Sequence, residues 1–212
     1  MRHPDFDLYV VTDRTQTGGR DLVEVVEQAL TGGVNAVQLR EKDLGGAELF
    51  QLAGTLKEAC ARHRARLFIN DRVDVAIAVD ADGVQLGGAA IPVGAARALL
   101  GEEKFIGASI HTLEEARDAE RAGADFLLFG PVYFTPSKAA YGAPQGLKRL
   151  KEVVEKISIP VYAIGGVFVD NVESIRQTGA RGAALISAII AAPDPAAAAK
   201  AILQRLKTKP NE

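Results

Sequence analysis

The stretch DLYVVTDRTQTGGRDLVEVVEQALTGGVNAVQLRE, residues 7–41, decides the fold. It begins with a short apolar run (7–13), continues through a segment of helical period that ends in Gly (21–33), and returns to a second apolar run (36–41). Short apolar runs are typical of strands covered on both faces, and Gly commonly follows the last residue of a helix. The stretch therefore predicts a strand, a helix and a second strand.

The same alternation continues along the rest of the chain. Further apolar runs with the character of strands lie at 66–71, 83–86, 105–109, 125–130, 160–166 and 182–188. Segments of helical period separate most of them, for example 47–63 and 112–124. Eight such units predict an α/β fold, a closed (β/α)8 or TIM barrel. We expect one domain over 1–212, with a frayed tail at about 207–212.

A doubly wound open sheet is the alternative for a chain of alternating strands and helices. Such a sheet usually has fewer strands, and the turn after its first strand favours a glycine fingerprint. The corresponding turn here, VVTDRTQTGG (10–19), lacks that fingerprint. The sequence therefore favours the closed barrel.

The composition argues against several kinds of partner and location. The formal net charge is -2, and the charged residues are spread along the chain, which argues against a nucleic-acid or membrane-surface partner. The start of the chain turns acidic too soon for a signal peptide, and no apolar run reaches the ~18 residues of a membrane span. A single cysteine, Cys60, excludes an internal disulfide. We expect a cytoplasmic protein that acts on small molecules; the oligomeric state stays open.

Polar residues and glycines follow almost every predicted strand. In a barrel the carboxyl ends of the strands share one rim, and ligands bind at that rim. The chemically active residues expected there are Asp13, Arg40, Glu41, Lys42, Asn70, Asp71, Ser109, His111 and Lys138. Because a purely structural scaffold has little reason to gather such residues, the sequence favours an enzyme.

Two features predict bound phosphate groups. The sequence IGG (164–166) follows the seventh strand and Ser187 follows the eighth, where barrels commonly bind a phosphate through backbone N–H groups and a short helix N-terminus. A tight turn with no ligand is the alternative explanation for the glycines. Cationic Arg40, Lys42 and Lys138 on the same rim suit a second, more highly charged ligand such as a diphosphate.

Motifs along most of the chain resemble one known family. They are QLREK (38–42), FINDRVDVA (68–76), ADGVQLG (81–87), SIHTLEEA (109–116), FGPVYFTPSK (129–138), and AIGG followed by GARGAALISAI (163–166 and 179–189). From about Leu8 to Leu206 the chain resembles thiamine phosphate synthase and its relative thiazole tautomerase. For the synthase, the resemblance implies a magnesium-dependent transferase that joins an aminopyrimidine diphosphate to a thiazole phosphate and releases pyrophosphate.

The resemblance also implies roles for individual residues. It places Gln38, Arg40, Lys42 and Asn70 on the pyrimidine diphosphate, Asp71 on magnesium, Ser109 and Lys138 on the departing pyrophosphate, Thr135 and Ser137 on the thiazole, and Gly166, Ile186 and Ser187 on its phosphate. Arg40, Ser109 and Lys138 are the candidate catalytic residues. Because the thiazole nitrogen is itself the nucleophile, the protein needs no general base and chiefly binds, orients and stabilises the leaving group.

The stretch GVQLGGAA (83–90) departs from the usual synthase pattern, Gly-Val-His-Leu-Gly-Gln-Glu-Asp. Gln85 stands at the histidine position, and Ala90 stands where a second aspartate would bind magnesium. Alanine cannot coordinate a metal, but Mg²⁺ can use one carboxylate together with waters and substrate oxygens. We therefore expect Mg²⁺ on Asp71 with a weakened site.

The departure keeps two other functions open. One is a thiazole tautomerase, which needs no metal and isomerises a thiazole carboxylate phosphate. Pro131 occupies the position of its catalytic histidine, so proton transfer would fall to Tyr133 or His111. The other is a catalytically impaired relative that binds a phosphate ligand. Because a mere phosphate binder has no need of Arg40 and Asp71, the sequence favours the synthase.

Overall fold

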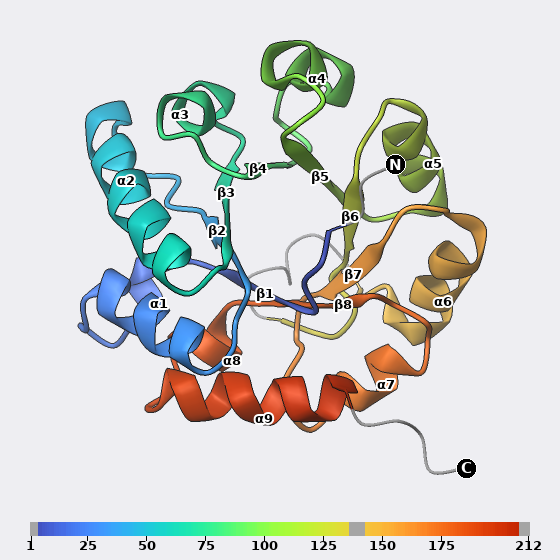
Figure 1. Cartoon of the computed structure of the whole chain (residues 1–212). Helices are drawn as coiled ribbons and strands as arrows, with labels where there is room; N and C mark the ends of the chain where they lie inside the picture. Colours follow the sequence, from blue (N-terminus) through green and yellow to red (C-terminus); the bar gives the residue numbers. More distant parts are fainter. Residues whose placement is uncertain (1–3, 136–142, 208–212) are drawn as a thin grey trace.

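The computed structural model describes residues 4–135 and 143–207 and contains a closed barrel of eight parallel strands (Figure 1). The strands are β1 (Leu8–Val11), β2 (Ala36–Leu39), β3 (Arg66–Asn70), β4 (Gly83–Leu86), β5 (Phe105–Ile110), β6 (Phe126–Phe129), β7 (Val161–Ile164) and β8 (Gly182–Leu185). They follow one another around the barrel in chain order, and β8 closes it by pairing with β1. The predicted TIM barrel is confirmed.

Helices surround the barrel on the outside (Figure 1). They are α1 (Leu22–Thr31), α2 (Gly46–Arg62), α3 (Val73–Ala78), α4 (Val93–Leu100), α5 (Leu113–Arg121), α6 (Gly146–Lys156), α7 (Val172–Arg176), α8 (Ser187–Ile190) and α9 (Pro195–Lys207), with a 3-10 turn η1 (Arg14–Gln16) after β1. The predicted frayed tail overlaps the end of α9, and residues 208–212 lie outside the described part of the chain.

Local chemistry fixes where several helices begin. The Asp21 carboxylate accepts hydrogen bonds from the backbone N–H groups of Val23 and Glu24, at 2.8 and 3.1 Å, at the start of α1. Thr112 caps α5 in the same way by accepting from Glu115 N–H at 3.1 Å. These contacts satisfy donors that the first turn of a helix leaves unpaired.

Successive side chains of a strand point to opposite faces of the sheet, and this alternation produces two separate hydrophobic cores. In β1, Leu8 and Val10 point outward into the core between the sheet and the helices, whereas Tyr9 and Val11 point into the barrel. The interior core also contains Phe6, Phe68, Phe105, Phe126, Leu128 and Tyr162. A filled interior means that the barrel is not a pore, and only its carboxyl end is left to hold a ligand.

Ion pairs brace the amino ends of the strands. The Asp82 carboxylate, just before β4, accepts hydrogen bonds from Leu67 N–H at 3.0 Å and from Lys57 at 2.9 Å. Asp125, just before β6, accepts from Ile106 N–H at 2.7 Å and from Arg97 at 2.6 Å.

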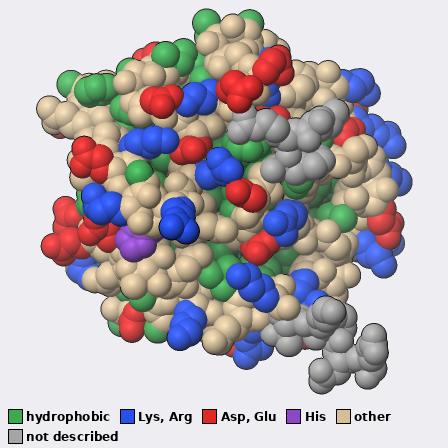
Figure 2. All heavy atoms as spheres, in the orientation of Figure 1, with side chains coloured by type: hydrophobic (Ala, Val, Ile, Leu, Met, Phe, Trp, Pro, Cys, Tyr) green, Lys and Arg blue, Asp and Glu red, His purple; other side chains and the backbone are tan. Residues whose placement is uncertain are grey.

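Acidic and basic side chains are interspersed over the face in Figure 2. No helix in the described part of the chain has the length and apolar character of a membrane span.

Candidate active site

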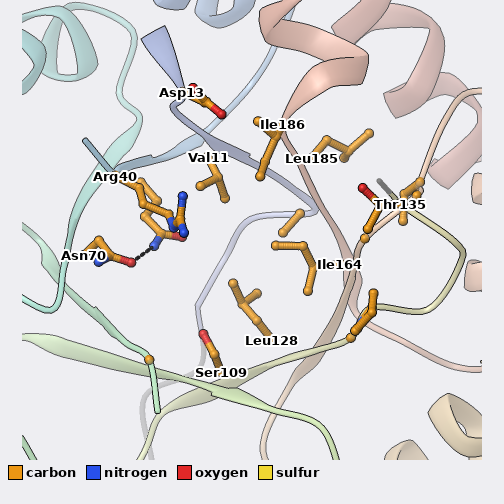
Figure 3. A pocket seen from close by; sticks show the side chains of 18 of the residues that line it. Val11, Asp13, Arg40, Asn70, Ser109, Leu128, Thr135, Ile164, Leu185 and Ile186 are labelled. Carbon is orange, nitrogen blue, oxygen red and sulfur yellow. Dashed lines mark hydrogen bonds between the residues drawn. The ribbon is translucent and has the colours of Figure 1, made fainter. Parts of the chain in front are cut away.

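A cavity of about 670 Å³ opens at the carboxyl ends of the strands, and residues at or after all eight strands line it (Figure 3). One part of the wall is polar, with Arg40, Asn70 and Ser109 (Figure 3). Another part carries Ile164 and Ile186 together with glycines of the loop after β7. The size suits a small-molecule ligand, and the uneven wall suits one with distinct charged and apolar parts.

Most residues that the sequence predicted for the site lie together in this wall. They are Gln38, Arg40, Lys42, Asn70, Ser109, Thr135, Gly166, Ile186 and Ser187. Asp13 and His111 join them, whereas Asp71 does not line the cavity itself. Ser137 and Lys138 lie outside the described residues. The structure thus brings these residues into one cavity at the carboxyl ends of the strands, and their individual roles stay predictions.

A chain of hydrogen bonds crosses from β2 to β4 along the polar part. Gln38 Nε2 donates to Asn70 Oδ1 at 2.9 Å (dashed line, Figure 3), and Asn70 Nδ2 donates to Asp71 Oδ2 at 2.9 Å. Asp71 Oδ1 then accepts from Gly87 N–H at 2.7 Å. Asp71 has a left-handed backbone, φ 58°, which turns its carboxylate toward the next loop. Each member orients the next, so the amides of Gln38 and Asn70 in the wall are held in place by protein contacts.

Two buried amide oxygens in this region lack a hydrogen-bond partner among the described residues. They are Oε1 of Gln38, 3% exposed, and Oε1 of Gln85, 1% exposed. An unpaired buried acceptor is destabilising by about 1–3 kcal/mol. Since Gln38 lines the cavity, a donor on a bound ligand can satisfy its oxygen.

Gln85 acts behind the wall through Ser109. Its Nε2 donates to Ser109 Oγ at 3.0 Å, which leaves the hydroxyl proton of Ser109 free to point elsewhere. Gly107 on β5 makes room for this amide, because a Cβ there would lie 2.2 Å from Gln85 Oε1 and 2.4 Å from the Phe126 ring. Ser109 is thereby prepared as a donor toward the cavity.

Charged groups at the cavity are ordered by their neighbours. Burial raises the pKa of Asp13, but hydrogen bonds from Thr15 and Gln16 and the charge of Arg40 outweigh it, so the net pKa is lowered. Asp13 is therefore a carboxylate at neutral pH. The backbone N–H of Arg40 donates to Thr12 Oγ1 at 2.9 Å, which holds the backbone that carries the Arg40 side chain.

The loops after β1 and β2 are clamped together beside these groups. Glu41, 5% exposed, accepts hydrogen bonds from the backbone N–H of Arg14 at 3.2 Å and from its Nη1 at 3.1 Å. Arg14 also pairs with Asp43 at 2.6 Å. The Glu41 carboxylate is therefore occupied by Arg14, and its role at the rim is to join the two loops.

Sequence reasoning missed Gln16, which lines the cavity, and Asn171, which braces the loop after β7. The available signal for Asn171 was its place shortly after the glycine pair and just before a helix, where Asn commonly bonds to nearby backbone. His111 lines the cavity. Its backbone N–H donates to Glu115 Oε2 at 2.6 Å, and its ring Nδ1 lies 3.2 Å from the same oxygen.

Comparison with known proteins places the chain in a family. A family model described as thiamine monophosphate synthase matches residues 8–189. A putative thiamine-phosphate synthase of Geobacter sulfurreducens is 51% identical over 206 residues, which is 97% of each chain. The thiamine-phosphate synthase of Syntrophomonas wolfei is 47% identical over 92% of this chain and 93% of its own. These matches confirm the resemblance predicted from the motifs.

Solved structures agree with the sequence matches. The thiamine phosphate pyrophosphorylase from Pyrococcus furiosus superposes with a TM-score of 0.87 at 40% identity, over 95% of this chain and 96% of that one. A 3-hexulose-6-phosphate synthase, with a TM-score of 0.72 at 22% identity over 94% and 99% of the two chains, shares the fold alone. On its family match, its close relatives and its barrel, the chain belongs to the thiamine monophosphate synthase family.

Proposed function

We propose that this chain joins an aminopyrimidine diphosphate to a thiazole phosphate and releases pyrophosphate, which is the thiamine phosphate synthase reaction. The observation that carries the proposal is the uneven cavity, with cationic and amide side chains on one part of its wall and the glycines of the loop after β7 on another. That arrangement suits two phosphorylated substrates in one cavity. The names of the relatives support the same reaction.

The chemistry needs positioning more than proton transfer. The bond between the pyrimidine methylene carbon and the diphosphate oxygen breaks, and the oxygen leaves with the electron pair. The thiazole nitrogen supplies the electron pair of the new C–N bond and becomes positively charged. No proton has to be removed, so charge stabilisation of the leaving diphosphate is the main task of the protein.

Named residues can carry each part of that task. In this proposal Arg40 and Lys42 bind the diphosphate, and the Ser109 hydroxyl donates a hydrogen bond to the leaving group. The unpaired Gln38 Oε1 accepts from the pyrimidine amino group. Ile186 packs against the thiazole while Gly166 and Ser187 hold its phosphate. The parts assigned to Thr135, Ser137 and Lys138 rest on the family resemblance.

The donors present fit a magnesium ion held mainly by substrate and water. Asp71 lies behind the polar wall, bonded to the cavity residue Asn70, and each of its oxygens accepts one hydrogen bond, so lone pairs remain for a cation at the edge of the cavity. No cluster of three acidic, His or Cys side chains that could hold a metal exists within residues 4–135 and 143–207. One carboxylate is compatible with Mg²⁺, which keeps waters and binds substrate phosphates. When bound, the ion would neutralise charge on the leaving diphosphate.

The tautomerase alternative finds less support in the site. Tyr133 does not line the cavity, burial raises the pKa of its phenol, and its hydroxyl donates to Asn171 O at 3.3 Å. His111 lies at the rim, half-exposed and bonded to Glu115. Neither side chain is placed as a proton shuttle deep in the cavity.

A cytoplasmic location stays a prediction.

One assay with purified protein tests the proposal. The pyrimidine diphosphate and the thiazole phosphate are mixed with enzyme across a magnesium titration, and thiamine phosphate and pyrophosphate are quantified. We expect equimolar products that depend on magnesium. In parallel, the thiazole carboxylate phosphate is supplied alone. Its isomerisation without thiamine phosphate formation in the first reaction would assign the chain to the tautomerase instead.

A further inference from the structure

Three successive carbonyl groups of the loop after β7 are held by hydrogen bonds. Ile164 O accepts from Val132 N at 2.9 Å, Gly165 O accepts from Tyr133 N at 3.0 Å, and Gly166 O accepts from Asn171 Nδ2 at 2.9 Å. The first two donors belong to the backbone of the loop after β6, and their presence does not depend on side-chain identity. The third donor is a side chain, so it alone can be removed by substitution.

Holding a carbonyl also aims the next N–H group. In a trans peptide the C=O and the following N–H point in opposite directions. With Gly166 O turned toward Asn171, the N–H of Val167 points away from Asn171. Gly166 and Val167 both line the cavity. Neither of their N–H groups donates to an acceptor within the described part of the chain, so both are available to an anion there.

The orientation of the Asn171 amide is fixed by its two partners. Its Oδ1 accepts from Phe168 N–H at 2.8 Å, so the other end of the amide must be the NH₂ group, and this group faces Gly166 O. The side chain bridges Phe168 N–H and Gly166 O and does not line the cavity. Asn171 can therefore influence a ligand only through the peptide that it holds.

The loop needs this restraint because two consecutive glycines form it. Gly165 and Gly166 have φ of 94° and 66°, and a Cβ on either would lie 2.6 Å from Pro131 Cβ or Phe134 O. Glycine is required at both positions, but glycine also permits other backbone conformations. A rotated peptide after Gly166 would present a carbonyl oxygen to the cavity and repel an anion.

We propose that Asn171 is a positioning residue for the phosphate of the thiazole substrate. It locks the Gly166 carbonyl outward and so presents the Val167 N–H to the phosphate, an assignment that rests on the proposed function. Among the contacts that this loop makes with residues 4–135 and 143–207, it is the one side chain that sets the direction of a cavity-facing donor. Its loss leaves the pyrimidine end, which lies across β2 to β5, unchanged.

Two variants separate the donor from the charge. Asn171→Asp keeps the acceptor for Phe168 N–H and loses the donor to Gly166 O, whereas Asn171→Ala loses both. Titration calorimetry should show binding of thiazole phosphate weakened at least about tenfold in both, and binding of inorganic pyrophosphate changed less than about twofold. The KM for thiazole phosphate should rise while kcat at saturation stays within about twofold. Tyr133→Phe, which removes only the hydroxyl bonded to Asn171 O, should match the wild type.

The outcomes keep this inference apart from the proposed function. Wild-type protein that neither binds thiazole phosphate nor makes thiamine phosphate overturns the function. Wild-type protein that does both, with Asn171→Ala binding thiazole phosphate equally well, overturns the role of Asn171. If only Asn171→Asp weakens the binding of thiazole phosphate, the cause is charge repulsion, and this result also overturns the role of Asn171.

A measurement on the wild-type protein tests the assigned phosphate donor even if the Asn171 variants do not fold. Inorganic phosphate titrated into ¹⁵N-labelled protein should shift the amide resonance of Val167, because that N–H is assigned to the phosphate. An amide resonance of Val167 that stays in place, while those of Ile186 or Ser187 move, rejects the proposal.

Discussion

At the amino end of the barrel interior, five aromatic rings pack with centroids 4.8–6.0 Å apart; they belong to Phe6, Tyr9, Phe68, Phe126 and Tyr162. At the carboxyl end, the strands present Gln38, Asn70 and Ser109 to a cavity. The aromatic end buries apolar surface with few polar atoms. The polar end retains two buried amide oxygens, of Gln38 and Gln85, that have no partner among the described residues, whereas the aromatic end leaves a single phenol oxygen, of Tyr9, in that state. This difference indicates that residues at the amino end of the barrel interior chiefly stabilise the fold, whereas residues at the carboxyl end chiefly bind the ligand.

The aromatic end gives the largest expected effect. Phe6 is fully buried against four rings, so Phe6→Ala should lower the free energy of unfolding by about 3–5 kcal/mol. Urea denaturation measures this, and the KM values of the folded fraction should not change. Phe50→Ala on α2 is the control, since Phe50 is 46% exposed and its loss should matter little. An active-site defect in Phe6→Ala without destabilisation would contradict the division between the ends.

The polar end predicts the reverse pattern. Gln38→Met keeps the approximate shape of the side chain and removes the unpaired oxygen together with the donor to Asn70. We expect kcat/KM to fall about 100-fold, equivalent to about 2.7 kcal/mol, while the free energy of unfolding changes by less than about 1 kcal/mol. Steady-state kinetics and denaturation of the same preparation provide both numbers. A strongly destabilised Gln38→Met with intact kinetics would show that Gln38 is a structural residue.

The edge of the polar end offers a smaller, directional test. Ala90→Asp adds a carboxylate in the loop after β4, next to the loop that carries Asp71. We expect the magnesium concentration for half-maximal rate to fall about tenfold, or about 1.4 kcal/mol, because two carboxylates can share the ion. Ala90 packs partly against the outer core, so the stability of the variant is measured alongside.

The neighbouring exposed position gives the matched control for that variant. Ala89→Asp adds the same charge on an exposed residue and should leave the magnesium dependence nearly unchanged. Equal gains from both substitutions would mean that added negative charge, rather than coordination, attracts the ion. If wild type and Ala90→Asp both fail to make thiamine phosphate at every magnesium concentration, the synthase reaction is wrong.

The smallest effects distinguish two hydroxyls within the aromatic end. Tyr162 Oη donates to Phe6 O at 2.8 Å, whereas Tyr9 Oη has no hydrogen-bond partner among the described residues. Tyr162→Phe should therefore lower the free energy of unfolding by about 1 kcal/mol, and Tyr9→Phe should leave it unchanged or raise it slightly. Differential denaturation of the pair checks this. Equal losses would show that Tyr9 has a partner, such as a buried water.

The fold could be predicted from the sequence because each unit repeats the same local pattern. Every apolar run expected to form a strand overlaps one, although β5 extends one residue past its predicted run, and polar residues that end those runs meet at one rim. The fine arrangement could not be predicted in this way. Gln85 bonds to Ser109 across 24 positions, and Asp71 turns to Gly87 instead of the cavity wall. Such pairings depend on rotamers set by neighbouring strands, which the local pattern does not encode.

Gly107 is where the two ends of the interior touch, since its missing side chain leaves space shared by Gln85 and the Phe126 ring. Elsewhere in the interior, a substitution among the aromatic rings changes the packing, and a substitution in the cavity wall changes the ligand site. A larger residue at position 107 would displace the Phe126 ring and the Gln85 amide together, so it would affect both the stability of the fold and the active site. Redesign of the cavity for new substrates should therefore leave Gly107 fixed and vary the residues around it.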